Sequence, residues 1–241
     1  ILERCVSSFP NSPLIVPALL QLGQAAADVR NFDKAVQLYD RVLELAPESQ
    51  QAQYARFGKA FIAIQNGSYQ DALALLDPVC ASGSDDYLTL EAQLARGICY
   101  RKSGAIDSAV QQLQAIASKA QGVQRGNVLF ELGLSFVAAR KNREAISTFE
   151  SLIADQNDFV WMDDVYFELG WAYKALGDAN QATHWFQQIL DRQPTSPRVA
   201  EASFQIGQAE YDSSKFDRAI QAYTVAASKS DDKQMQEKAL Y

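Results

Sequence analysis

The chain has 241 residues, of which 48% are hydrophobic and 21% charged, and its net charge is −7. This acidic balance, without any basic run, argues against nucleic acid as a partner. No apolar stretch approaches the ~20 residues that a membrane-spanning helix needs, so we expect no direct membrane insertion.

Two segments far apart in the chain are nearly the same. Residues 10–26 read PNSPLIVPALLQLGQAA, and residues 194–210 read PTSPRVAEASFQIGQAE. The glycine in this line recurs six times, at intervals of 35, 39, 36, 37 and 37 residues. Self-similarity at such a period is typical of repeat proteins whose units stack on one another. The recurring glycines are Gly23, Gly58, Gly97, Gly133, Gly170 and Gly207.

Two further positions recur at a nearly fixed distance after each glycine. An alanine comes twelve residues later in five units, and fourteen residues later in the second unit, which carries a two-residue insertion. Four residues beyond each alanine stands a large side chain: Tyr39, Leu76, Leu113, Phe149, Phe186 and Tyr223. A glycine inside a helix costs about 1 kcal/mol relative to alanine, so six in one phase indicate close packing of two helices. Each unit is therefore predicted to be a pair of antiparallel helices joined by a short turn.

The resulting fold class is all-α, with six complete helix pairs and a partial pair at each end, in a single array over residues 1–241. The other six glycines are predicted to lie in turns: Gly67, Gly83, Gly104, Gly122, Gly126 and Gly177. In chain order we expect the end of a preceding repeat at 1–13, repeats at 14–48, 49–84, 85–122, 123–158, 159–195 and 196–231, and the start of a further repeat at 232–241. The fragment is thus expected to come from a longer array.

Pro78 is the main local irregularity. It falls within the second helix of the second unit, where its missing amide donor and its ring disfavour a continuous helix. We expect this helix to end early or to kink. The segment CASGSDD, residues 80–86, is then expected to make the least regular joint of the array.

Three acidic pairs could be metal ligands or general acids, but each falls at the predicted start of a helix. Carboxylates there cap free amides and favour the positive helix end, and capping is the interpretation that we prefer. The pairs are Asp85-Asp86, Asp163-Asp164 and Asp231-Asp232. The single histidine, His184, has no partner ligand nearby in sequence. Without a nucleophile elbow, phosphate loop or zinc helix, the chain is predicted to be no enzyme and to hold no cofactor or metal.

The segment DFVWMDD, residues 158–164, gathers apolar side chains at a joint between repeats. One interpretation is a hydrophobic staple that folds over the start of the next helix. The other is a knob that anchors a partner protein, because aromatic and methionine side chains dominate such anchors.

These recurring positions resemble those of the tetratricopeptide repeat. In the fifth unit the pattern comprises Tyr166, Leu169, Gly170, Tyr173, Ala182, Phe186, Ile189 and Pro194. The resemblance covers almost the whole chain and implies a right-handed α-α superhelix. The linkers FPNSP and QPTSP are in addition similar to a bacterial cell-envelope subclass, which implies a periplasmic or cell-envelope location in preference to a cytoplasmic one.

The family resemblance also implies a groove that receives a peptide or protein partner. Its positions lie three residues before the recurring glycine and one, four and five residues after it. The predicted partner-binding residues are Phe130, Leu134, Phe167, Trp171, Lys174, Phe204, Gln208 and Tyr211. The Lys and Arg pattern that clamps a terminal carboxylate in some members is missing here. The expected function is a non-catalytic interaction scaffold in cell-envelope assembly; the alternative is a regulatory or targeting region of a larger enzyme.

Overall fold

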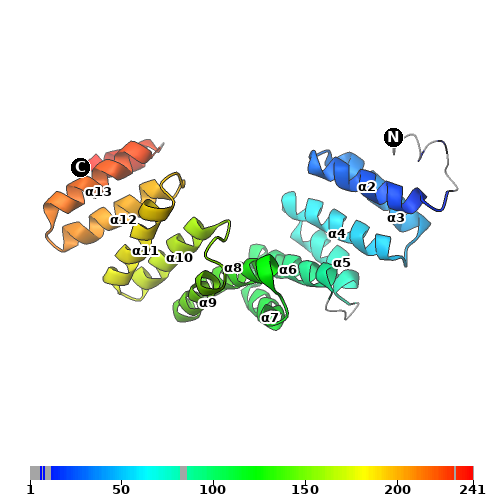
Figure 1. The fold of residues 1–241 in the computed structure, drawn as a ribbon, viewed down its shortest axis with the longest axis horizontal. Helices are drawn as coiled ribbons and strands as arrows, with labels where there is room; N and C mark the ends of the chain where they lie inside the picture. The colour runs from blue at the N-terminus through cyan, green and yellow to red at the C-terminus, as the bar shows by residue number, and fades with distance from the viewer. Residues whose placement is uncertain (1–5, 7, 9–11, 82–85, 231, 241) are drawn as a thin grey trace. The chain divides into compact units, whose positions relative to one another are not determined.

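The computed structural model describes residues 6, 8, 12–81, 86–230 and 232–240. Within these residues the regular structure is helical throughout, in the elements α2 to α14 (Figure 1). Contacts divide the chain into two compact units, residues 1–120 and 121–241. The two units are described separately below.

The first unit contains three helix pairs. The helices of a pair are consecutive in the chain and pack on each other, and α3 and α5 also pack on the first helix of the next pair. The all-helical paired fold predicted from the sequence is confirmed. The six helices are α2 (Ile15–Asp28), α3 (Phe32–Leu45), α4 (Gln50–Gln65), α5 (Tyr69–Cys80), α6 (Tyr87–Lys102) and α7 (Ile106–Ala117).

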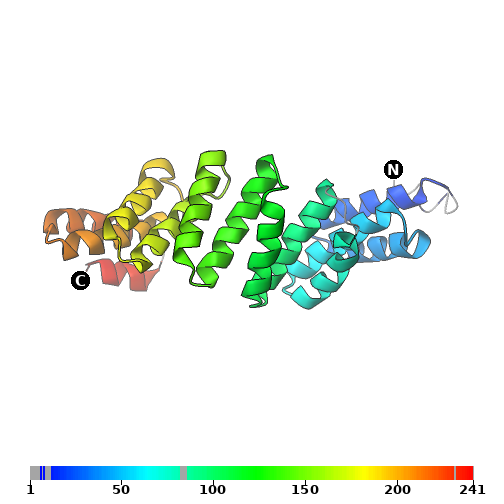
Figure 2. The same cartoon turned by 90° about the horizontal axis from the view of Figure 1, so that it is seen from below.

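The second unit repeats this arrangement and adds one short helix. Consecutive helices again pack as pairs, and the final helix packs on α13 (Figure 2). The helices are α8 (Gly122–Ala138), α9 (Asn142–Asp155), α10 (Met162–Ala175), α11 (Ala179–Arg192), α12 (Val199–Asp212), α13 (Phe216–Lys229) and α14 (Lys233–Leu240).

The recurring glycines lie where the two helices of a pair meet. A β-carbon added to Gly133 would lie 2.3 Å from the Phe149 ring, and one added to Gly170 would lie 2.5 Å from the Phe186 ring. Gly23, Gly97 and Gly207 face Tyr39, Leu113 and Tyr223 in the same way. The large residue sixteen positions after the glycine thus fills the space that a side chain would need.

The second pair departs from this rule because of its two-residue insertion. Gly58 in α4 faces the ring of Tyr39 in the preceding pair, at 2.6 Å from the added β-carbon, and not its own Leu76. Tyr39 therefore lies between the glycines of two consecutive first helices, and its side chain is only 1% exposed. Burial, with a smaller contribution from Asp28, raises the pKa of Tyr39 to about 12.

Each turn between paired helices contains one residue in the left-handed conformation. Three are glycines, at Gly67, Gly104 and Gly177; the other three are Arg30, Arg140 and Ser214. In five units this residue lies seven positions after the recurring glycine, and in the second unit it lies nine positions after, because of the insertion. Glycine adopts this conformation without the steric cost that a β-carbon brings.

Gly177→Ala is expected to lower the free energy of unfolding by about 1 kcal/mol, because alanine is strained at positive φ. The φ of Gly177 is +81°, and no atom lies within 4 Å of an added β-carbon, so packing does not contribute. Urea unfolding checks this. Ser214→Ala is the matched control, since it keeps a β-carbon at a left-handed turn residue with φ of 59° and is expected to change stability little.

Two of the predicted turn glycines lie in a helix. Gly122 begins α8 but has the left-handed φ of +52° that a turn glycine adopts, whereas Gly126 lies within the helix. A β-carbon on Gly126 would lie 2.4 Å from the side chain of Gln156, whose amide donates to the carbonyl of Gly122. Gly126 is therefore a packing glycine and not a turn glycine. The prediction for Gly83 lies outside the described residues.

Pro78 does not interrupt α5 where it stands. The helix continues two residues further, to Cys80, and the amide of Ala81 still donates to the carbonyl of Asp77. At 12 residues α5 is shorter than the 14-residue α3, but α7 also has 12 residues and no proline. The length of α5 therefore gives no sign that Pro78 ends the helix early. Because Pro78 is only two residues from the last residue of α5, little of the helix follows it. The joint at 82–85 lies outside the described residues.

Candidate functional site

The described residues of the acidic pairs bind backbone amides or neighbouring side chains. No three histidine, cysteine or acidic side chains gather as metal ligands among the residues that the structure describes. Asp86 caps α6 by accepting from the Thr89 amide at 2.8 Å, and Asp232 accepts from the Gln234 amide at 2.9 Å, as predicted. Asp85 and Asp231 lie outside the described part of the chain. His184 is exposed, and its ring lies 5.2 Å from that of Trp185.

Asp163 and Asp164 lie in the first turn of α10, as predicted, but α10 has no side-chain cap hydrogen bond, and both carboxylates bind side chains before α12 instead. Asp163 accepts a hydrogen bond from Ser196, and Asp164 pairs with Arg198 at 2.7 Å. These bonds tie the start of α10 to the segment before α12. The side chain of Arg198 also lies over the Phe167 ring, 4.7 Å from its centroid. Sequence spacing gave no signal for these contacts, because they join residues more than thirty positions apart.

The DFVWMDD segment buries two of its apolar side chains and leaves two exposed. Phe159 and Met162 are buried at 6% and 2% exposure, as a staple requires, whereas Val160 and Trp161 are exposed. Phe130 of α8 packs against two rings of this segment: its ring centroid lies 5.6 Å from that of Phe159 and 5.5 Å from that of Trp161. Phe130 is only 8% exposed, so this predicted partner-binding residue belongs to the packed interior of the joint. Leu134, one turn further along α8, is half-buried.

Phe167 and Trp171 of α10 form an aromatic cluster with Phe186 of α11. The centroids of the three rings lie 6.0 to 6.2 Å apart in edge-to-face arrangements. Phe186 is 1% exposed, while Phe167 and Trp171 are half-buried and keep part of their surface in solvent. Such pairs add about 0.5–1.5 kcal/mol beyond area burial, so Phe186 holds the two partly exposed rings in place.

Lys174 joins this cluster to α12. Its ammonium lies 5.1 Å from the centroid of the Trp171 ring and donates to the side-chain oxygen of Gln205. The amide nitrogen of Gln205 in turn donates to Glu201 at 2.8 Å. Lys174 is exposed despite these contacts, and so it presents a fixed positive charge beside an aromatic face.

Two clefts continue the surface along α12. A cleft of about 170 Å³ between α10, α11 and α12 is lined by Lys174 and Gln208 among others. A second cleft, of about 460 Å³, lies between α12, α13 and α14 and is lined by Gln208, Tyr211 and Ile220 among others. Tyr211 and Ile220 are 55% and 63% exposed. Phe204, half-buried, packs against Tyr223 with centroids 5.5 Å apart.

Six of the eight predicted residues are linked one to the next: Phe167 contacts Trp171, Trp171 contacts Lys174, Lys174 and Gln208 share one cleft, Gln208 and Tyr211 share the next, and Phe204 packs on Tyr223, which lines that second cleft. We call this set the α10–α12 surface: Phe167, Trp171, Lys174, Phe204, Gln208 and Tyr211. Phe130 and Leu134 of α8 are not part of it. The apolar residues of α13, Phe216 and Ile220, are more than half exposed beside it and were missed, because the predicted groove positions fall on first helices only.

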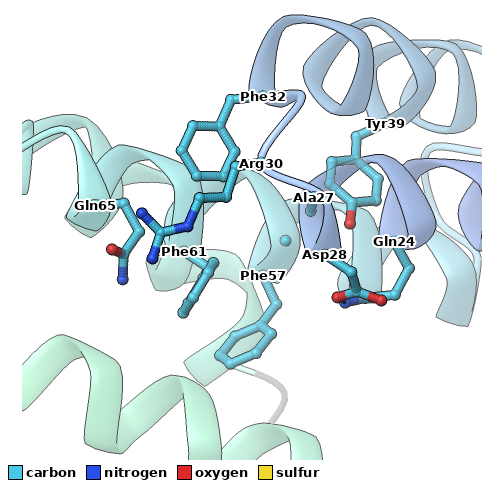
Figure 3. Close-up of a pocket in the computed structure, with 10 residues that line it drawn as sticks. Gln24, Ala27, Asp28, Arg30, Phe32, Tyr39, Phe57, Phe61 and Gln65 are labelled. Carbon is cyan, nitrogen blue, oxygen red and sulfur yellow. Dashed lines mark hydrogen bonds between the residues drawn. The ribbon is translucent and has the colours of Figure 1, made fainter.

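A further cleft lies in the first unit, and none of the eight predicted partner-binding residues lines it, although Gln24, Ala27 and Asp28 of α2 stand at groove positions after Gly23. Its volume is about 460 Å³, and it lies between α2, α3 and α4 (Figure 3). Phe57 and Phe61 line it from α4, but they lie one residue before and three residues after Gly58, outside the groove positions. No helix among the described residues is long and apolar enough to cross a membrane.

Comparison with known proteins places these surfaces in a family context. Two family models, both described as Tetratricopeptide repeat, match the chain, one at residues 20–87, 57–123 and 167–233 and the other at residues 127–156. Together they cover most of the chain. No curated protein sequence matches at a significant level.

Solved structures of similar fold agree with the family match. A tetratricopeptide repeat protein from Parabacteroides merdae ATCC 43184 is 17% identical, with a TM-score of 0.65 over 99% of this chain and 88% of its own. MamA is 19% identical, with a TM-score of 0.62 over 76% and 97% of the two chains. A putative kinesin light chain from Podosopora anserina, with nearly identical TPR-like repeats, is 20% identical, with a TM-score of 0.61 over 79% and 98%. These likenesses concern the fold alone.

Proposed function

The chain belongs to the tetratricopeptide-repeat family, whose fold serves in general as a scaffold for protein interactions, and from this premise we propose that the α10–α12 surface binds a segment of another protein. The role is non-catalytic: the side chains of this surface hold a partner and carry out no reaction on it.

The observation that carries the proposal is the half-exposed aromatic cluster fixed on a buried ring. Phe167 and Trp171 are held by Phe186 and flanked by the cations Arg198 and Lys174. Aromatic rings that keep part of their surface in solvent, with their orientation already set, lose little conformational entropy when a partner covers them. Binding anchors are enriched in tryptophan, tyrosine and arginine, the residue types that this cluster presents in Trp171 and Arg198.

The two clefts along α12 extend the surface beyond the cluster. Gln208 lines both clefts, so the two clefts are neighbours. A segment bound beside Trp171 can therefore run from the first cleft into the second, where it reaches Tyr211 and the exposed apolar side chains of α13. The side chains of Lys174 and Gln208 supply hydrogen-bond donors along this path. The expected ligand is therefore an amphipathic or apolar segment, with its apolar side on the rings.

Trp171→Ala is expected to weaken partner binding by about 2 kcal/mol or more, which is roughly thirtyfold in Kd. The partner is first recovered from the native host by a photo-crosslinking amino acid at position 208, with position 184 on α11 as the control. Affinity is then measured by calorimetry with the purified pair. Tyr87→Ala, which removes an exposed ring in the first unit, is the matched control and is expected to bind normally.

A loss of helical content or of thermal stability in the Trp171 variant would make the ring a packing element and not an anchor. Unchanged affinity in a folded Trp171 variant would refute the binding surface itself. The cell-envelope location stays a prediction, supported by the linker resemblance; fractionation of the native host tests it.

A further inference from the structure

The cleft in the first unit combines aromatic walls with a charged rim, and it shares no residue with the α10–α12 surface. From α4 come Phe57 and Phe61, and from the start of α3 comes Phe32. The buried ring of Tyr39 and the bare backbone at Gly58 also line it. The Tyr39 ring packs against the α4 backbone at Gly58 and closes the floor of the cleft.

The shape of the cleft favours a side chain from a protein over a small molecule. Its volume of about 460 Å³ is within the usual range for ligand pockets, but Phe61 is 49% exposed, so one wall is open to solvent. Small-molecule sites typically enclose about 70–90% of their ligand, which an open wall does not allow. A ring carried on a partner's surface needs enclosure on one side only, because the partner covers the other.

The charges at the rim are not equivalent. The carboxylate of Asp28 already accepts a hydrogen bond from the Gln24 amide at 2.9 Å. The guanidinium of Arg30 makes no ion pair or side-chain hydrogen bond with the part of the chain that the structure describes. Figure 3 shows Arg30 on the side of Phe32 and Phe61, with Asp28 across the cleft beside Gln24. The charge available to a ligand is therefore the positive one.

We propose that this cleft binds a partner-protein segment that presents one aromatic side chain next to an aspartate or glutamate. The aromatic ring lies against Phe57 and Phe61, and the neighbouring carboxylate pairs with Arg30. A guanidinium binds a carboxylate with two parallel hydrogen bonds, which fixes the order of ring and charge along the segment. This inference does not depend on the α10–α12 surface.

Four synthetic tetrapeptides with acetylated and amidated ends test the proposal: Gly-Trp-Asp-Gly, Gly-Trp-Asn-Gly, Gly-Trp-Lys-Gly and Gly-Ala-Asp-Gly. Each is titrated into the full chain and followed by amide chemical shifts in two-dimensional NMR. The Trp-Asp peptide is expected to shift amides of α2, α4 and the Arg30 turn, and to bind about tenfold more tightly than the Trp-Asn peptide. The Ala-Asp peptide is expected to cause no shift there, and the Trp-Lys peptide is expected to bind most weakly of the three with a ring.

Two variants assign the contacts. Arg30→Gln is expected to bring the Trp-Asp peptide down to the affinity of the Trp-Asn peptide, whereas Phe61→Ala weakens both peptides alike. Arg140→Gln is the matched control, because Arg140 occupies the same turn position with φ of 57°, against 58° for Arg30. Equal affinity for the Trp-Asp and Trp-Asn peptides, preference for the Trp-Lys peptide, or no shift in the cleft with any peptide would each overturn the proposal.

Discussion

Gly133→Leu is expected to lower the free energy of unfolding by about 3 kcal/mol or more. Even the first added carbon would lie 2.3 Å from Phe149, the shortest such distance among the recurring glycines. Phe149 is fully buried and meets Phe130 at 6.4 Å between ring centroids, so its ring has no free space to enter. The two helices α8 and α9 must therefore separate, which removes contacts along the whole pair.

Chemical unfolding followed by circular dichroism measures this loss. Ala138→Leu is the control, because it adds the same side chain at an exposed position of the same helix and avoids the interface with Phe149. If the Gly133 and Ala138 variants lose the same stability, the recurring glycine reflects something other than close helix packing.

Tyr39→Ala is expected to cost about 3–5 kcal/mol, the range for removing a large buried ring. The ring fills the space opposite two glycines, Gly23 in α2 and Gly58 in α4, so its loss opens one cavity that both helix pairs share. The cost is expected to exceed that of Phe186→Ala, because Phe186 faces a glycine of its own pair alone.

Tyr39→Phe separates the ring from its hydroxyl. It is expected to change stability little near neutral pH, since the raised pKa keeps the hydroxyl protonated in the folded state. Above pH ~10 the unfolded chain ionises this tyrosine first, so the wild-type protein loses stability as the pH rises toward 12, and the phenylalanine variant loses less. An alanine variant as stable as the phenylalanine variant would contradict the shared-cavity interpretation.

The helix pairs could be predicted because their packing requires a small and a large residue at a fixed distance in the sequence. Gly170 and Phe186 stand sixteen residues apart because one clears the space that the other fills, and this relation recurs in five of the six units. Gly126 was misplaced for a physical reason as well. A glycine that makes room for Gln156, the residue after α9, and a glycine that allows a turn are identical in sequence, and only the three-dimensional neighbour separates them.

The candidate site could be predicted only in part. Trp171 and Lys174 are one turn apart on α10, so helical spacing alone brings them together, and the cation does lie over the ring. The burial of Phe130 depends on the path of the joint that contains Phe159 and Trp161, which helical periodicity does not describe. The cleft at Arg30 joins groove positions of α2, Gln24, Ala27 and Asp28, to Phe57 and Phe61 of α4, which stand outside the groove positions, so the groove rule describes only one of its walls.

Amide hydrogen exchange of the full chain, with and without the recovered partner, tests the central claim most directly. If the α10–α12 surface is the binding site, the partner slows amide exchange in α10 and α12. Exchange in α9 and in the exposed residues of α11 stays unchanged. Local opening sets these rates, so added protection reports where the partner rests. Protection confined to α9 and α11, or to the first unit, would contradict the claim.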